Sequence, residues 1–183
     1  SIAYYSNQNL KILVIDRSPE YLPGRKSIAG WVCGDACSKE AVDFMTEKIK
    51  VKWTKPEIEH DVKGVMAFSP DMETSIPFDG DGFMLNRTKL PEIQNERCRK
   101  IGIEFEFEIN ITGLIYDEQQ VVGVQGIDNK IKQPFKKTSK IVIDATGVTS
   151  MLRNGLKNST KVEKRIDRRD LESTGRYIMY FDK

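Results

Sequence analysis

Asp16 and the small-residue turn 145–147, each placed after an apolar run, are the features best suited to binding chemistry. Asp16 ends the run Ile12–Ile15, and Asp144 ends the run Ile141–Ile143 just before the small-residue turn 145–147. In α/β sheets, ligands bind at the carboxyl ends of the strands, and an acidic residue after the second strand of a dinucleotide fold accepts hydrogen bonds from ribose hydroxyls. A glycine turn ahead of a helix favours phosphate. The two runs therefore predict a dinucleotide-type site.

Cys33 is the side chain that offers reaction chemistry. The run Cys33–Asp35 is predicted to open a helix, and the positive end of a helix dipole lowers the pKa of a thiol and favours the thiolate. A small buried cysteine packed at a tight turn explains the same residue equally well. Cys33 and Cys37 are four residues apart, but two thiols without further ligands make a poor metal site. We therefore predict no metal ion.

Arg87 offers a positive charge next to a predicted helix. Its guanidinium group could hold a pyrophosphate through two parallel hydrogen bonds. A surface arginine in the first turn of a helix is the alternative, although a cation is poorly placed at that end of the dipole. That unfavourable position slightly favours a functional role. Arg153 is expected to have a structural role in fixing the turn after Gly147.

Composition excludes several classes of function. The chain has 183 residues and a net charge of +2, so no strong field for nucleic acid is expected. It holds one histidine, His60, in a charged run, which leaves little material for a Ser-His-Asp triad or a histidine-based metal site. Its three cysteines do not suggest a disulfide framework and favour a reducing cytoplasm. No apolar run approaches the length of a transmembrane helix.

The elements that must position these residues follow a mixed order of helices and strands. Ile12–Ile15 and Ile141–Ile143 are predicted to be buried strands of a parallel sheet. Three short strands joined by Asp-rich and Asn-rich turns predict a β-meander over 112–136. The remaining predicted elements are helices over 1–9, 33–45 and 87–99, strands over 66–68, 75–78, 82–85, 103–111 and 177–181, and a turn at 79–82.

Both ends of the sequence are expected to be interior to a longer protein. A glycine fingerprint should precede the first helix of a dinucleotide fold, yet Ser1 already lies in that predicted helix. The run Tyr177–Phe181 reads as a strand whose partners lie beyond Lys183. We therefore expect a fragment truncated at both ends that neither binds a cofactor tightly nor turns over by itself.

Four patches in this order resemble the geranylgeranyl reductase family, whose members are flavoproteins with a p-hydroxybenzoate-hydroxylase-like fold. They are ILVIDR (12–17), VCGDA (32–36), FMLNRTKL (83–90) and IDATGVTSMLR (143–153). The resemblance spans about residues 10–155. Thr146 departs from it, because many relatives have Asp before the glycine at 147.

The resemblance implies FAD as the cofactor. It places Asp16 at the adenosine ribose, Arg87 near the phosphate and ribose, and the backbone of Ile111, at the end of its strand, at the adenine. It also places the flavin beside the backbone at Cys33, Gly34 and Ala36, and it makes Thr146 and Gly147 the turn before a helix of the flavin domain. Cys33 is the tentative catalytic residue, near which a proton is delivered.

The implied fold is a partial Rossmann-like FAD-binding domain with a β-meander and part of an antiparallel-sheet substrate domain. We expect residues 1–60 and 83–157 to form the two parts of the FAD-binding domain. Residues 61–82 are expected to supply substrate-domain strands, and residues 158–183 to begin the substrate or catalytic domain.

The implied activity is hydride transfer from reduced flavin to isoprenoid C=C bonds of a prenyl lipid or prenyl diphosphate. NADPH and reduced ferredoxin both remain open as the electron donor. A flavin-dependent aromatic monooxygenase of the same fold and a non-catalytic fragment are the alternatives. The expected location is the cytoplasm. The basic segment 157–169 could contact anionic lipid headgroups at a membrane surface, although a solvated charged face explains its composition better.

Overall fold

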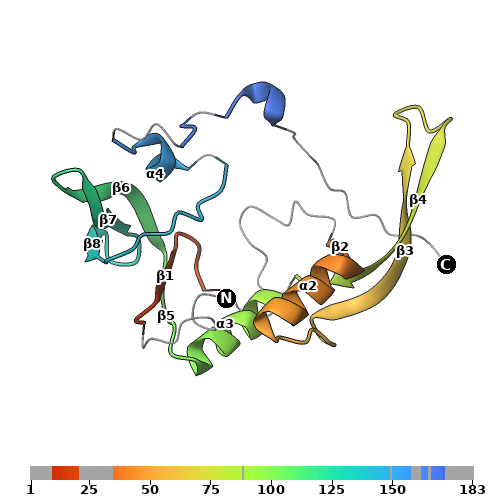
Figure 1. Cartoon of the computed structure of the whole chain (residues 1–183), viewed down its shortest axis with the longest axis horizontal. Coiled ribbons are helices and arrows are strands. Elements are labelled where there is room, and N and C mark those ends of the chain that lie inside the picture. The colour runs from red at the N-terminus through yellow and green to blue at the C-terminus, as the bar shows by residue number, and fades with distance from the viewer. Residues whose placement is uncertain are drawn as a thin grey trace. The chain divides into compact units, whose positions relative to one another are not determined.

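A computed structural model describes residues 10–20, 35–87, 89–148, 150–157, 162–164 and 166–171. The chain divides into two compact units. The first, here called the hairpin unit, comprises Ser1–Ile12, Tyr21–Glu104 and Thr174–Lys183. The second, the meander unit, comprises Leu13–Glu20 and Phe105–Ser173 (Figure 1). The predicted helix at 1–9, Cys33, Gly34 and the predicted strand at 177–181 lie outside the described residues.

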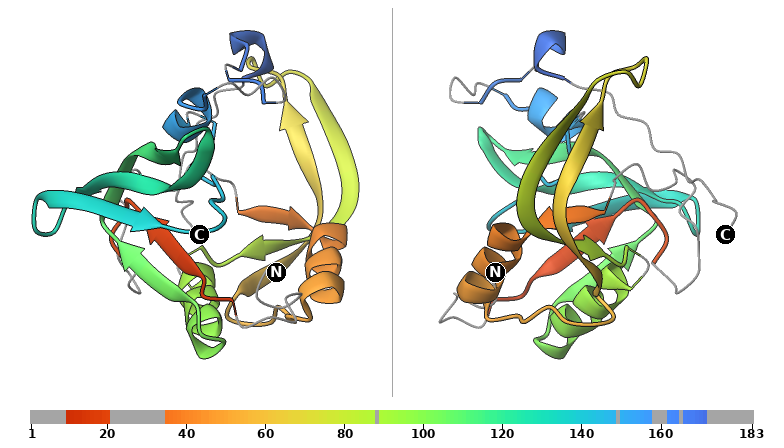
Figure 2. Two further views of the ribbon diagram at one scale, coloured as in Figure 1. Left: turned by 60° about the vertical axis from the view of Figure 1, so that its left-hand side comes forward. Right: turned by 90° about the vertical axis from the view of Figure 1, so that its right-hand side faces the viewer.

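The hairpin unit is built on a three-stranded antiparallel sheet in the order β2–β4–β3. Helix α2 packs against β2 and β4 (Figure 2). The elements are β2 (Ala36–Ser38), α2 (Lys39–Ile49), β3 (Ile58–Phe68), β4 (Ser75–Leu85) and α3 (Leu90–Lys100). Val42, Leu85 and Leu90 are the buried apolar residues of this unit within the described part of the chain.

Helix α2 starts later than the sequence predicted. Its N-cap is Ser38, whose hydroxyl accepts a hydrogen bond from the amide of Ala41 at 3.2 Å. The preceding residues 36–38 pair with β4 instead of continuing the helix. The prediction that 33–35 opens this helix is therefore wrong, because strand pairing and a serine cap fix its start at Lys39.

Strands β3 and β4 form one long hairpin where short runs and a turn at 79–82 were predicted. The turn lies instead at the tip, where the amide of Ser69 donates to the carbonyl of Thr74 at 2.9 Å. The glycines allow close backbone approach: a Cβ on Gly82 would lie 2.7 Å from the carbonyl oxygen of Cys37. A Cβ on Gly64 would lie 2.6 Å from the carbonyl oxygen of Phe78. The Asp-Gly cluster is thus part of a strand, because Gly82 serves close pairing with β2 and not chain reversal.

The meander unit combines a two-stranded β1–β5 sheet with the antiparallel sheet β6–β7–β8. Amide-to-carbonyl bonds from Glu104 to Ile12 and from Glu108 to Ser18 advance along both segments in the same direction, as in a parallel pair. The elements are β1 (Leu13–Asp16), β5 (Glu104–Phe107, its first residue assigned to the hairpin unit), β6 (Ile109–Asp117), β7 (Gln120–Asp128), β8 (Gln133–Thr138), α4 (Met151–Asn154) and the 3-10 turn η1 (Arg168–Asp170). The predicted meander is confirmed.

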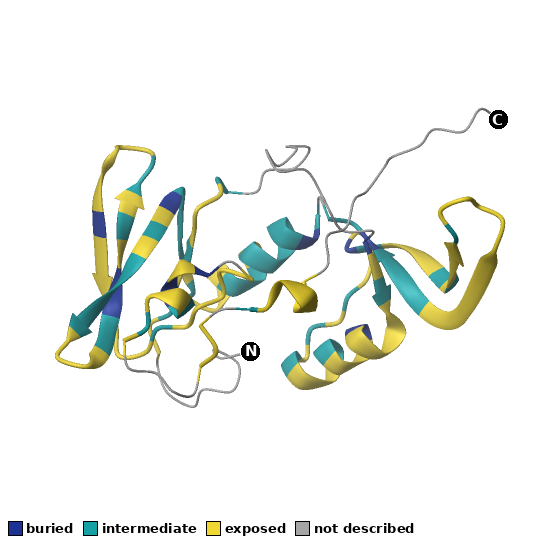
Figure 3. Ribbon diagram, turned by 90° about the horizontal axis from the view of Figure 1, so that it is seen from above, coloured by how far each residue is buried: buried dark blue, intermediate teal, exposed yellow. Residues whose placement is uncertain are grey.

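The core of the meander unit joins the sheet to the short helix. Its fully buried members are Ile109, Val124, Phe135 and Leu152. Partly buried side chains from β1, β6 and the segment after β8 pack against it, namely Ile15, Ile111, Leu114 and Val142. Figure 3 shows how few residues of either sheet are fully buried. The core thus anchors both segments that end in the predicted binding residues.

The run Ile141–Ile143 does not form the predicted strand. The structure assigns no strand there, and Ile141 and Ile143 are 77% and 63% exposed. Val142 alone packs against the core. An apolar run becomes a strand only when a neighbour pairs with its backbone, and the described part of the chain supplies none.

Candidate functional site

The loop after residue 143 is organised around the carboxylate of Asp144. Its Oδ1 accepts hydrogen bonds from the amide of Thr146 at 3.0 Å and from that residue's hydroxyl at 2.7 Å. Its Oδ2 accepts a short hydrogen bond from the hydroxyl of Ser150. The Ser150 oxygen in turn caps α4 by accepting from the amide of Arg153 at 3.0 Å. A single carboxylate therefore holds the turn against the start of the helix.

These bonds set the charge state of Asp144. Partial burial by itself would raise the pKa of this carboxyl group. Hydrogen bonds from Ser150 and Thr146 outweigh that effect and lower the pKa below its ordinary value. The group is therefore ionised at neutral pH, where it acts as an acceptor for its own loop.

Gly147 gives this loop its reversal and leaves one side open. Its φ is +86°, in the left-handed region that favours glycine, and a Cβ placed there would meet nothing within 4 Å. The guanidinium of Arg153 donates to the carbonyl of Val148 at 2.6 Å, which confirms its structural role. The backbone N–H groups of Thr146 and Ser150 already donate hydrogen bonds inside the loop, to the carboxylate of Asp144 and to the carbonyl of Gly147. The open face at Gly147 is the part that a ligand can approach.

Asp16 lies exposed at the last position of β1. Its Oδ1 accepts a hydrogen bond from the amide of Ser18 at 2.7 Å, which turns the chain directly after the strand. An ionised carboxylate accepts several hydrogen bonds, so one backbone donor leaves capacity for a ligand hydroxyl. This geometry suits the predicted ribose contact.

Ile111 is not at the end of its strand, as the sequence had predicted. The backbone breaks earlier, at Glu108, whose φ is +63°, and a new strand begins at Ile109. Ile111 pairs with Gly126 of β7, and its side chain packs against the core. The alternation over 103–111 hid this break, because one left-handed residue interrupts pairing without changing the apolar pattern.

Arg87 precedes α3, which begins at Leu90, and contacts a carboxylate of its own unit. Its Nε donates to the Oδ1 of Asp35 at 3.2 Å. The Asp35 residue is 8% exposed, and its carbonyl accepts from the amide of Leu85 at 2.8 Å. The pair gives Arg87 a structural partner, while its side chain remains 34% exposed.

A second carboxylate–arginine pair lies at the same end of β4, and sequence reasoning missed it. Glu57 is 2% exposed, and its Oε1 lies 2.6 Å from the Nη1 of Arg97 on α3. The contact lacks hydrogen-bond geometry, so it is an ion pair. The carbonyl of Glu57 also accepts from the amide of Asn86 at 2.8 Å. The sequence pattern indicated only the apolar positions of α3. It held no signal that Arg97 has a buried carboxylate as its partner.

The predicted site residues divide between the two units. The meander unit holds Asp16, Ile111, Thr146 and Gly147, and the hairpin unit holds Ala36 and Arg87, with Ala36 exposed at the start of β2. Cys33 and Gly34 lie outside the described residues. Because α2 begins at Lys39, Cys33 is not in its first turn, so the helix-dipole argument for a thiolate fails. Cys37 lies in β2, so it does not share a helix face with Cys33.

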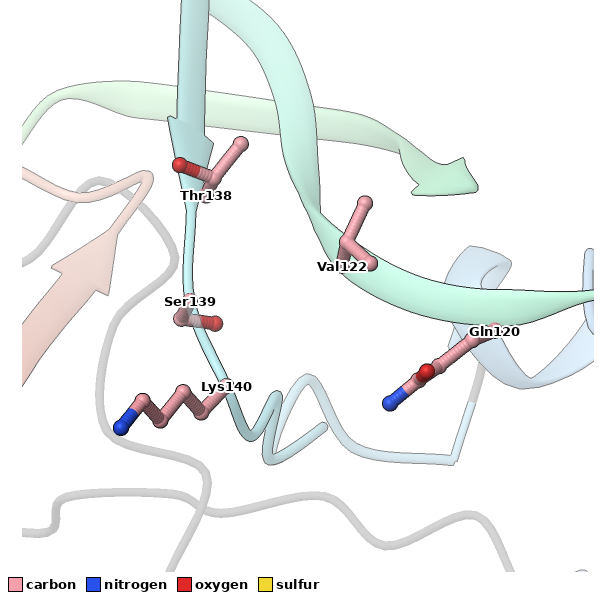
Figure 4. A pocket seen from close by; sticks show the side chains of 5 residues that line it. All are labelled: Gln120, Val122, Thr138, Ser139 and Lys140. Carbon is pink, nitrogen blue, oxygen red and sulfur yellow. The ribbon is translucent and has the colours of Figure 1, made fainter. Parts of the chain in front are cut away.

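A shallow hollow on the meander is separate from these residues. It is lined by Gln120, Val122, Thr138, Ser139 and Lys140, and Figure 4 shows Val122 of β7 and Thr138 of β8 bordering it. Ser139 is tied locally, since its hydroxyl donates to the carbonyl of Ile141 at 2.9 Å. None of the predicted binding residues lines the hollow.

Within the described ranges, no cluster of three or more His, Cys, Asp or Glu side chains is arranged to hold a metal ion. Cys37 and Cys98 are free thiols. No helix among the described residues is both long and apolar enough to cross a bilayer.

The fold is one that flavin enzymes use. A geranylgeranyl bacteriochlorophyll reductase-like protein from Thermoplasma acidophilum superimposes with a TM-score of 0.60, at 23% identity, over 79% of this chain and 35% of that one. The myxobacterial chondrochloren halogenase, an FAD-dependent halogenase, gives a TM-score of 0.55 at 12% identity, over 79% of this chain and 33% of its own. The predicted mixed α/β fold class is confirmed.

The sequence itself is homologous to part of two archaeal reductases. It is 28% identical over 181 residues to the digeranylgeranylglycerophospholipid reductase of Sulfolobus acidocaldarius, covering 98% of this chain and 38% of that protein. It is 27% identical over 182 residues to the protein of the same name from Methanocella arvoryzae, covering 95% of this chain and 41% of that one. No protein-family model matches the chain. The resemblance to geranylgeranyl reductases is confirmed, and the chain spans about two fifths of the length of these relatives.

Proposed function

We propose that this chain is part of an FAD-dependent oxidoreductase that reduces isoprenoid C=C bonds of a geranylgeranyl lipid. The observation that carries the proposal is the continuous similarity to two digeranylgeranylglycerophospholipid reductases along 98% and 95% of the chain. The fold supports the same class, because the solved structures that share it include an FAD-dependent halogenase. A fold alone does not define a reaction, so the substrate rests on the sequence relatives.

The meander unit contains residues that fit an adenine dinucleotide. Asp16 presents an exposed carboxylate at the end of a parallel-type strand, which suits a ribose diol. Gly147 presents an open backbone face on a loop held rigid by Asp144. Thr146 stands beside it with its own polar groups committed to that loop. In this proposal Asp16 orients the ribose, and Gly147 allows close approach to the phosphates.

The chemistry that bound, reduced FAD supplies is hydride donation to one carbon of the alkene. An isolated alkene is a poor electrophile, so alignment of the substrate must contribute much of the rate. The protein must also deliver a proton to the other carbon. We propose that this proton comes from water or from a group near Cys33. Ala36, Gly34 and Arg87 remain predicted cofactor contacts, and NADPH or reduced ferredoxin remains the proposed electron source.

The domain assignment and the cellular setting belong to the same proposal. Residues 1–60 and 83–157 are proposed to supply the cofactor domain, and residues 61–82 and 158–183 to supply parts of the substrate domain. We also propose a prenyl lipid or prenyl diphosphate as substrate, and a cytoplasmic location with peripheral contact to the membrane.

The test is made on the natural protein, with whatever sequence flanks residues 1–183. It is purified, its visible spectrum is recorded, and it is reduced anaerobically before a geranylgeranyl lipid is added. We expect a flavin spectrum, reoxidation by the lipid, and a mass gain of two hydrogens for each bond reduced. Cys33→Ser should then slow reoxidation by lipid more than it changes flavin content, with Cys98→Ser as the matched control.

Two other outcomes would overturn the proposal. Bound flavin that only oxygen reoxidises would indicate an oxygenating enzyme of the same fold, such as an aromatic monooxygenase. A protein that carries no flavin and binds none when supplied with FAD would contradict both the proposed cofactor and the proposed reductase activity.

A further inference from the structure

Asp35 joins two segments that each hold a predicted cofactor contact. It directly precedes Ala36 in the chain, and its Oδ1 accepts a hydrogen bond at 3.2 Å from the Nε of Arg87, which lies 52 residues further on. Its carbonyl accepts from the amide of Leu85 at 2.8 Å. The residue therefore ties the start of β2 to the chain after β4 through both its backbone and its side chain.

The residue type at position 35 is an unfavourable choice for a purely structural link. The φ of Asp35 is +66°, in the left-handed region that favours glycine. The residue is 8% exposed, and a buried carboxylate requires a partner. A buried ion pair returns little net stability. Glycine would adopt the same backbone without strain or a buried charge, so stability of the hairpin unit does not account for a carboxylate here.

The carboxylate fixes the direction of the Arg87 guanidinium. This group is planar, and its five N–H donors form a rigid fork that matches a phosphate. A hydrogen bond at Nε sets the orientation of the plane, because Nε lies in the plane and joins it to the aliphatic stem. The Asp35 side chain is 11% exposed and that of Arg87 is 34% exposed. A buried acceptor thus holds a cation that still reaches the surface.

We propose that Asp35 is a positioning residue that orients Arg87 for FAD. The proposal rests on the proposed function, in which Arg87 is a predicted cofactor contact. Asp35 acts through Arg87 and does not itself touch the cofactor. An arginine that is already oriented loses less side-chain freedom when the cofactor binds, which strengthens binding. Both residues belong to the hairpin unit, so the arrangement depends on contacts within one unit alone.

The Glu57–Arg97 pair of the same unit offers an internal comparison. It also joins a buried carboxylate to an arginine whose side chain is 34% exposed. Neither of its members is a predicted cofactor contact. Both acids can be replaced by the amide of the same size, so the two pairs can lose the same charge with the same small change in shape.

The first experiment is a double-mutant cycle on FAD binding by the natural protein. The FAD dissociation constants of Asp35→Asn, Arg87→Ala and the double variant are measured by titrating the cofactor-free protein. Asparagine tolerates the left-handed backbone and removes only the charge. We expect losses of affinity of about tenfold or more for Arg87→Ala and about fivefold or more for Asp35→Asn. In the Arg87→Ala background, Asp35→Asn should cause no further loss, because the two residues act as one unit.

Glu57→Gln in the same two backgrounds is the matched control, and its effect on FAD affinity should be equal in both. Equal effects of Asp35→Asn in both backgrounds would indicate a structural role and overturn the proposal. Unchanged affinity in Arg87→Ala would overturn it too, while FAD binding by the parent protein would leave the proposed function standing. A parent protein that binds no FAD would overturn both.

Substitute variants cover a failure to fold. Asp35→Gly replaces Asp35→Asn, since glycine adopts this φ without strain. Arg87→Lys replaces Arg87→Ala, since lysine keeps the positive charge without the planar fork. The same coupling is expected in this second cycle, and additive effects would again overturn the proposal.

The second experiment measures the orientation of Arg87 without cofactor. In protein labelled with ¹⁵N-arginine, the Nε–H signal of Arg87 is assigned by its loss in Arg87→Lys. We expect Asp35→Asn to speed exchange of this proton with water about fivefold or more, since a neutral acceptor holds it less tightly. The Nε–H of Arg169, which donates to Asp167, is the reference and should not change. Unchanged exchange at Arg87 would overturn the proposal.

Discussion

Two buried carboxylates of the hairpin unit are each paired with an arginine. Asp35 contacts Arg87, and Glu57 contacts Arg97. Backbone amides at the end of β4 donate to the carbonyls of both acidic residues. The pairs therefore attach the start of β2, the start of β3 and α3 to one strand end. A buried ion pair adds little net stability but is costly to break from one side.

Replacing Arg97 with alanine should destabilise the hairpin unit strongly. The change leaves the carboxylate of Glu57, which is 2% exposed, without its partner. Removing one member of a buried pair costs about 3–5 kcal/mol, and partial exposure of Arg97 places the expectation near the lower end. Urea unfolding of Arg97→Ala measures it, with Lys100→Ala on the exposed end of α3 as the control. A loss as small as that of the control would show that water already solvates Glu57.

Asp144 should make stability depend on pH in the acid range. Its pKa is lowered in the folded chain, so its contribution is present above the ordinary carboxyl value of about 4 and is lost as pH falls through the lowered value. Asp144→Asn should lower the free energy of unfolding by about 1 kcal/mol at neutral pH, since it weakens only the few hydrogen bonds that Thr146 and Ser150 donate to this side chain. The difference between the variant and the parent should shrink below pH about 4.

Unfolding free energies measured at several pH values check this expectation. Asp117→Asn, an exposed acid at the end of β6, is the matched control. A cost for Asp144→Asn that stays constant into acid would mean that the loop does not depend on the ionised form.

At the scale of elements, the meander depends on glycines that allow strands to approach closely. A Cβ on Gly126 would lie 2.1 Å from the carbonyl oxygen of Asn110 and 2.8 Å from the Cα of Ile111. Both neighbours are backbone atoms, which cannot rotate away. The pairing of β6 with β7 therefore requires glycine at this position.

Gly126→Ala should destabilise the meander unit by about 1–3 kcal/mol, the usual cost of forcing extra volume into a packed site. Gly113→Ala is the matched control, because a Cβ there would first meet the flexible Gln125 side chain at 3.5 Å. Hydrogen exchange of β6 and β7 measures both variants. Equal effects would mean that the strands can shift apart without cost.

At the scale of the whole molecule, the proposed cofactor gives a direct prediction for Asp16. Asp16→Ala should weaken FAD binding by the natural protein about tenfold or more, since about two charge-assisted hydrogen bonds to a ribose are lost. The ratio of flavin to protein absorbance after dialysis measures it. Asp117→Ala should retain the parent's flavin content. This prediction rests on the proposed function. Equal loss of flavin in both variants would show that Asp16 does not contact the cofactor.

The sequence by itself determined the elements whose signals are local. The β-meander followed from alternating residues and Asp-rich turns, and α3 followed from its apolar spacing and the glycine after it. The relation to geranylgeranyl reductases likewise followed from four short patches. Each of these signals lies within a few residues, so it needs no knowledge of distant contacts.

Tertiary structure decided whatever depends on segments far apart in the chain. It placed Asp79–Gly82 inside β4, because a glycine there admits the backbone of β2. It left Ile141–Ile143 without a strand, because an apolar run needs a paired neighbour. It paired Glu57 with Arg97, forty residues apart, which no local pattern indicates. Close backbone approach, strand pairing and charge burial each require two segments that are distant in the sequence. A local sequence pattern shows only one of those two segments.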